Sequence, residues 1–119
     1  MTKIILDTNI LLSKHKIDIF SEISRICDFN YELCVLDKTL EELKNKKGSK
    51  LALNLITAKR VGIIKTKMDK SVDDLILELV EMEKSAIVVT QDIDLKRLLK
   101  EKGIKTITIR QNKYLKFVN

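Results

Sequence analysis

The sequence has no proline, no low-complexity linker and only three glycines among its 119 residues. Nothing in it therefore marks a boundary between two folding units, and a chain of this length has the usual size of one domain. We expect a single domain over residues 1–119, in which residues 110–119 form a basic C-terminal tail. A separate cofactor-binding module is not expected.

Cysteine and histidine are also scarce: the chain has only Cys27, Cys34 and His15. A structural zinc site takes four ligands, so these three residues do not predict one. Both cysteines lie among apolar residues and are expected to be buried thiols, whereas His15 lies in a polar stretch. No apolar run approaches the ~18 residues that cross a bilayer, and the first residues do not resemble a signal peptide. We therefore expect a cytoplasmic protein with no disulfide bond and no membrane-spanning segment.

The charge of the chain is abundant and segregated. Its net charge is +6, with ten basic and three acidic residues over 38–70, one basic and seven acidic over 71–94, and eight basic and one acidic over 95–119. A basic surface attracts polyanions, of which nucleic acid is the commonest, but a lysine-rich surface also serves solubility alone. The five aromatic residues provide no evident platform for stacking bases.

Short apolar runs alternate with helical patterns along the chain. The runs have the length of buried strands, and they are residues 4–6, 33–36, 61–64, 86–89 and 107–109. Helices are expected between them, begun by Asp37, Ser49 and Ser71 and ended by Gly48, Gly62 and Gly103. This alternation predicts an α/β fold, a three-layer α/β/α sandwich around a central, mainly parallel five-stranded sheet.

Acidic residues follow three of the five expected strands. Asp7 ends the first strand, Asp37 follows the second, and Asp92 and Asp94 follow the fourth. Ligands bind at the carboxyl ends of strands in such a sheet, and Asp7 meets Asp92 there if the first and fourth strands are neighbours. Clustered carboxylates repel one another unless protons or cations neutralise them, and oxygen ligands alone favour Mg²⁺ or Mn²⁺. Each acid taken singly has a bland alternative as a helix cap or a solvated charge.

Four segments in order resemble the motifs of the PIN-domain nucleases, especially the small archaeal-type members. They are Ile5-Leu6-Asp7-Thr8-Asn9, Leu40-Glu41-Glu42-Leu43, Val72-Asp73-Asp74-Leu75-Ile76 and Val88-Val89-Thr90-Gln91-Asp92-Ile93-Asp94-Leu95. By this resemblance the catalytic, metal-holding acids are Asp7, Glu42, Asp74 and Asp92, with Asp94 as an auxiliary ligand. Asp74 is chosen over Asp73 by its spacing to Leu77. Thr8, Asn9, Asp73 and Thr90 are expected to support these acids.

The resemblance implies a metal-dependent endoribonuclease that uses one or two Mg²⁺ or Mn²⁺ ions to hydrolyse RNA phosphodiester bonds. The RNA backbone is expected to contact basic residues near the acids, namely Lys44, Lys46, Lys47, Lys50, Lys96 and Arg97. By the same resemblance the protein forms a homodimer. It acts either in ribosomal RNA processing, with ribosome-assembly factors, or as the toxin of a toxin–antitoxin pair, with an antitoxin protein.

Two other functions suit an α/β domain of this length. A receiver-type phosphoacceptor domain needs an acidic pair after the first strand, an acceptor Asp after the third and a Lys after the fifth. This sequence has Asp7-Thr8, Lys65-Thr66 and Arg110 at those places, so that function is disfavoured. A non-catalytic RNA-binding or assembly module on the same fold is the remaining alternative.

Overall fold

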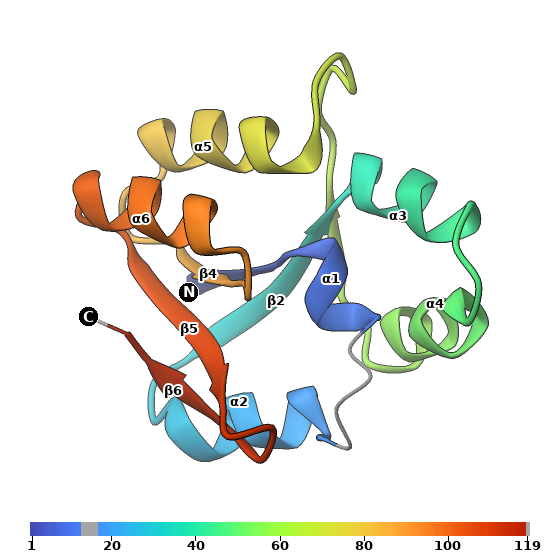
Figure 1. Ribbon diagram of the computed structural model, residues 1–119, viewed down its shortest axis with the longest axis horizontal. Helices are drawn as coiled ribbons and strands as arrows, with labels where there is room; N and C mark the ends of the chain where they lie inside the picture. The colour runs from blue at the N-terminus through green and yellow to red at the C-terminus, as the bar shows by residue number, and fades with distance from the viewer. Residues whose placement is uncertain (13–16, 119) are drawn as a thin grey trace.

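The computed structural model describes residues 1–12 and 17–118. Its six strands form one sheet in the order β3-β2-β1-β4-β5-β6 (Figure 1). They are β1 (Thr2–Leu6), β2 (Tyr31–Leu36), β3 (Gly62–Ile64), β4 (Ile87–Val89), β5 (Lys105–Arg110) and β6 (Tyr114–Phe117). Neighbouring strands are parallel except β5 and β6. The helices are α1 (Thr8–Leu11), α2 (Ile19–Ile26), α3 (Asp37–Lys44), α4 (Ser49–Ala58), α5 (Val72–Met82) and α6 (Ile93–Glu101).

Helices cover both faces of the sheet. Successive residues of β1 point to opposite faces, so Ile4 and Leu6 pack with residues of α1 to α4, and Ile5 packs with residues of α5 and α6. Figure 1 shows α5 and α6 side by side across one face and α2 on the other. The predicted α/β/α sandwich is confirmed, with six strands rather than five.

The sixth strand comes from the C-terminal tail. Tyr114–Phe117 pairs with β5 in an antiparallel hairpin, and Leu115 is buried opposite Ile109. The turn before it has left-handed backbone at Gln111 (φ 53°) and Asn112 (φ 55°). Asn-Gly or Asp-Gly pairs are the strongest signals for such turns, and here only Asn112 offers a weaker one.

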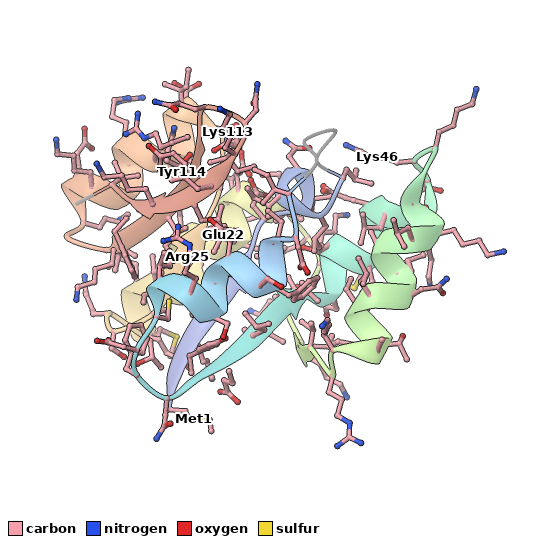
Figure 2. All side chains as sticks on the ribbon, turned by 90° about the horizontal axis from the view of Figure 1, so that it is seen from below. Met1, Glu22, Arg25, Lys46, Lys113 and Tyr114 are labelled. Atoms are coloured by element: carbon pink, nitrogen blue, oxygen red, sulfur yellow. The ribbon has the colours of Figure 1, made fainter. Side chains whose placement is uncertain are left out.

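A carboxylate–guanidinium pair on α2 covers the free edge of β6 (Figure 2). Glu22 Oε1 accepts a hydrogen bond from Leu115 N (2.9 Å), and Arg25 Nη2 donates to Leu115 O (3.3 Å). The two side chains also bind each other, with Arg25 Nε 2.9 Å from Glu22 Oε2. The pair therefore satisfies backbone groups that an unpaired edge strand otherwise offers to another chain.

The helix ends follow the sequence only in part. Ser71 caps α5 by accepting from Asp74 N, and Gly103 has left-handed backbone (φ 73°) after α6, as predicted. Gly62 was wrongly expected to end a helix: it begins β3, and the left-handed residue after α4 is Arg60 (φ 54°). Gly48 is left-handed but precedes α4 instead of ending α3, which stops at Lys44.

Two further predicted helix starts are displaced by one residue. Asp37 and Ser49 were expected to be N-caps, but each is the first residue of its helix. Cys27 and Cys34 are free and buried, and burial raises the pKa of the Cys34 thiol to about 11. His15 lies outside the described residues. None of the described helices is long and apolar enough to cross a membrane.

Candidate active site

The carboxyl ends of β1 and β4 lie next to each other, which is the condition under which Asp7 was expected to meet Asp92. Leu6 is opposite Val89, and Asp7 N continues the ladder by donating to Val89 O (3.0 Å). Asp7 and Thr90 are therefore the first residues beyond two neighbouring strands. Residues 83 positions apart in the chain meet there because a parallel sheet brings all its carboxyl ends to one edge.

Asp7 is a buried carboxylate held in one orientation, with 3% of its surface exposed. Thr90 Oγ1 donates to its Oδ2 (2.7 Å), and Thr8 N donates to its Oδ1 (2.8 Å). Burial raises the pKa of Asp7 above its ordinary value; the hydrogen bonds oppose this rise, and the charges of Asp92 and Glu42 add to it. Its environment thus penalises the negative charge.

Glu42, in the second turn of α3, is linked to Asp7 through Thr8. The hydroxyl of Thr8, itself buried, donates to Glu42 Oε1 (2.9 Å). Neighbouring helical residues point about 100° apart. Glu41 is accordingly exposed and pairs with Lys38 (3.1 Å).

Asp73, in the first turn of α5, is electrostatically coupled to the same carboxylates. Its side chain is half-buried, and its pKa is raised to about 6. Burial is the largest cause, followed by the negative charges of Asp7, Asp92 and Glu42. Asp74 is exposed, and its backbone N–H donates to Ser71 Oγ (3.2 Å). Of this acidic pair, Asp73 faces the other acids.

Asp92 both caps α6 and is tied to Asp7 through a shared threonine. Its Oδ1 accepts from Leu95 N (2.8 Å), and its own backbone N donates to Thr90 Oγ1 (3.1 Å). Thr90 thus bonds both acids. Asp94 points away: its side chain is 86% exposed and lies 3.9 Å from Arg97. Asn9 is exposed on α1.

Gln91, which the sequence did not single out, fixes the turn that carries Asp92. Its Oε1 accepts from Ile109 N (2.7 Å) and from the Thr108 hydroxyl. The side chain therefore takes the place of a backbone partner where β4 has already ended beside β5. A lone glutamine after a strand carries no sequence signal for such a role.

Asp7, Glu42, Asp73 and Asp92 are called the acid cluster below. Within residues 1–12 and 17–118, no three Asp, Glu, Cys or His side chains converge on a common metal position. The donor chemistry nevertheless fits a hard divalent cation, since every side-chain donor is an oxygen. The charges that most strongly shift the pKa of Asp7 and Asp73 are all negative. A divalent cation would supply the missing countercharge.

Comparison with known proteins places the chain in a family. The family described as "PIN like domain" matches residues 4–112, which include every member of the acid cluster. The chain belongs to the PIN-like domain family. The resemblance carried by the four motifs is therefore confirmed.

Two relatives of this PIN-like domain share its sequence or its fold over nearly their whole length. A protein named Ribonuclease VapC4 from Methanocaldococcus jannaschii is 35% identical, with 96% of this chain and 95% of the relative covered. The solved structure of a PIN domain endonuclease named Utp24 superposes with a TM-score of 0.85 at 23% identity, covering 98% of this chain and 90% of its own. At that identity the second comparison supports the fold alone.

The basic residues expected to contact RNA lie in two groups in this PIN-like domain. Four exposed lysines lie at the end of α3 and the start of α4: Lys44, Lys46, Lys47 and Lys50. In the second group, Lys96 is half-buried with Nζ 3.5 Å from Thr108 Oγ1, and Arg97 is exposed and pairs with Asp94 and Glu101. The side chains of the first group are therefore all exposed, whereas those of the second have partners within the domain.

The raised pKa of Asp73 predicts a pH-dependent stability without metal. A carboxyl group with a pKa of about 6 in the folded state and about 4 in the unfolded state binds more protons when folded. The contribution of this group to the free energy of unfolding is therefore fully present below pH 4 and is lost as the pH rises to about 6. The amide that replaces the carboxyl group in Asp73→Asn does not titrate, so the variant does not lose this stability. After allowance for solvent screening of the half-exposed group, we expect the free energy of unfolding of Asp73→Asn to rise by about 1–2 kcal/mol relative to the wild type between pH 4 and pH 6.

Urea unfolding in EDTA at several values between pH 4 and pH 7.5 measures this difference. Asp74→Asn is the matched control, because it removes the same charge one residue away and its stability relative to the wild type is expected to vary less with pH. A difference between Asp73→Asn and the wild type that is the same at every pH would contradict the prediction.

Proposed function

We propose that this chain is a metal-dependent endoribonuclease that hydrolyses RNA phosphodiester bonds at the acid cluster. The observation that carries the proposal is the set of four carboxylates from four separate segments, with Asp7 buried among them at the carboxyl edge of the sheet. Burying carboxylates together costs stability, and functional sites commonly bear such a cost. The relative named a ribonuclease supports RNA as the substrate.

In this proposal Asp7, Glu42, Asp73 and Asp92 hold the metal, and Asp73 takes the place that motif spacing gave to Asp74. A divalent cation held by these residues would supply Lewis-acid chemistry, that is, polarisation of the phosphoryl group and a more acidic water molecule at neutral pH. Asp94 is left outside because its side chain points to solvent.

The neighbouring polar residues position these ligands. Thr90 orients Asp7 through its hydroxyl group and Asp92 through that residue's backbone N–H. Thr8 orients Glu42, and its backbone N–H fixes the second oxygen of Asp7. These hydrogen bonds restrict the orientations of Asp7 and Glu42 before a cation binds.

Exposed lysines at the α3–α4 end, adjacent to Glu42, draw the RNA backbone toward the site. A second copy of the chain is the proposed partner subunit, by resemblance to the family. Ribosomal RNA maturation and the toxin role both use the same chemistry, and a neighbouring antitoxin-like gene would favour the toxin role.

Incubation of the purified protein with labelled single-stranded RNA and Mn²⁺ tests the proposal. We expect internal cleavage with Mn²⁺ and none with excess EDTA, because the carboxylates alone carry no countercharge for the reacting phosphate. RNA that is bound but never cut under any divalent metal would instead favour the non-catalytic binding module.

A further inference from the structure

The loop between β3 and α5, residues 65–71, lies at the same edge of the sheet as the acid cluster. Ile64, the last residue of β3, is opposite Leu36 of β2. The register of β1 and β2, in which Ile5 is opposite Cys34, places Asp7 level with Leu36. Two strand spacings therefore separate the end of β3 from Asp7, a distance of about 10 Å.

Part-buried hydrogen bonds fix this loop to the start of α3. Asp37 Oδ2 accepts from Thr66 N (2.9 Å), and its Oδ1 accepts from Thr66 Oγ1 (2.6 Å) and from Lys38 N (2.8 Å). Thr66 Oγ1 in turn accepts from Met68 N (3.1 Å). The loop is thus held by several hydrogen bonds to one carboxylate and to itself.

Thr66 points inward, and the lysines on either side of it, Lys65 and Lys67, are exposed. Within the described residues neither lysine lies within ion-pair distance of a carboxylate. Lys70 of the same loop is instead paired with Glu78. Asp69 is the one acidic residue of the loop. Apart from the paired Lys70, the loop therefore carries two unpaired ammonium groups and one carboxylate.

On the basis of the proposed nuclease function, we propose that Lys65 and Lys67 bind the phosphate backbone of the RNA strand beside the acid cluster. The cluster repels phosphate, so nearby cations must offset that repulsion when a strand is bound. Lysine ammonium groups on flexible stems bind phosphates as point charges without reading bases. The contact is therefore independent of sequence and lies on the β3 side of the acid cluster.

Binding of a fluorescein-labelled 20-nucleotide oligouridylate, followed by anisotropy in EDTA over a range of salt concentrations, tests this assignment. EDTA prevents cleavage and keeps the acid cluster free of metal in the wild type and in every variant. Lys65→Gln/Lys67→Gln is compared with Lys84→Gln/Lys105→Gln, a loss of the same two charges at the opposite, amino-terminal end of β4 and β5. We expect the slope of log K against log salt to shrink by about 1.4 in the loop variant, and affinity to fall roughly 10- to 30-fold at 0.1 M salt. The control is expected to keep the wild-type slope.

Equal slopes in wild type and loop variant would overturn the assignment, as would an equal decrease in both double variants, because that result reports net charge alone. In either case RNA cleavage by the wild type with Mn²⁺ leaves the nuclease function standing. A wild type that neither binds nor cuts RNA would overturn both proposals together.

Discussion

Asp7→Asn is expected to lower Mn²⁺-dependent RNA cleavage by about 100-fold or more, since the metal-held chemistry is worth several kcal/mol. Asparagine has the same shape as aspartate and can still accept from Thr8 N while its amide group pairs with Thr90 Oγ1. The substitution therefore removes the charge that holds the cation and keeps the geometry.

The same substitution is expected to leave stability without metal equal to or above that of the wild type. Asp7 is buried, and the charges of Asp92 and Glu42 oppose its ionisation, so the neutral amide relieves repulsion. Cleavage rates with Mn²⁺ and melting temperatures in EDTA measure the two effects. Asp28→Asn, an exposed aspartate between α2 and β2, is the control. Full activity of Asp7→Asn would end the proposed mechanism, and a large drop in its melting temperature would assign Asp7 a capping role.

The sheet was predictable because its central strands β1, β4 and β5 are largely buried and because its strands consist mainly of apolar, often β-branched residues. The runs at residues 4–6, 33–36, 61–64, 86–89 and 107–109 all lie in or beside strands of the structure. The rule for parallel sheets gave the edge at which the acids were expected to meet, on the condition that β1 and β4 are neighbours, and in the structure they are.

Contacts between distant segments could not be predicted in the same way. Asp37 was expected to cap a helix locally, but it binds Thr66, 29 residues further along the chain. Gln91 reaches Thr108 and Ile109 of the next strand. Such pairs leave no periodic pattern in the sequence, because each depends on where two loops come to lie after the sheet has formed.

The choice between Asp73 and Asp74, unlike these long-range contacts, could be made from the sequence, because the helical periodicity of α5 distinguishes the two residues. Asp73 lies on one stripe of α5 with Ile76 and Val80, three and seven residues later, and both are fully buried. Asp74 lies on a stripe with Glu78 and Glu81, both exposed. Motif spacing to Leu77 favoured Asp74, whereas amphipathicity favours Asp73, the residue that the structure couples to the cluster.

Asp73→Asn is accordingly expected to lower Mn²⁺-dependent cleavage about 10- to 100-fold, and Asp74→Asn to stay within about twofold of the wild type. The two variants form a matched pair, because each removes one negative charge from the first turn of α5 and so changes the interaction with the helix dipole alike. The cap contact survives in both, since Ser71 accepts from the backbone of Asp74. The readout is the cleavage rate of labelled single-stranded RNA at pH 7.5 over a titration of Mn²⁺. If Asp73 is a ligand, its variant also needs more Mn²⁺ for half-maximal rate; if Asp74→Asn shows the larger loss, Asp74 holds the metal and α5 must rotate when the cation binds.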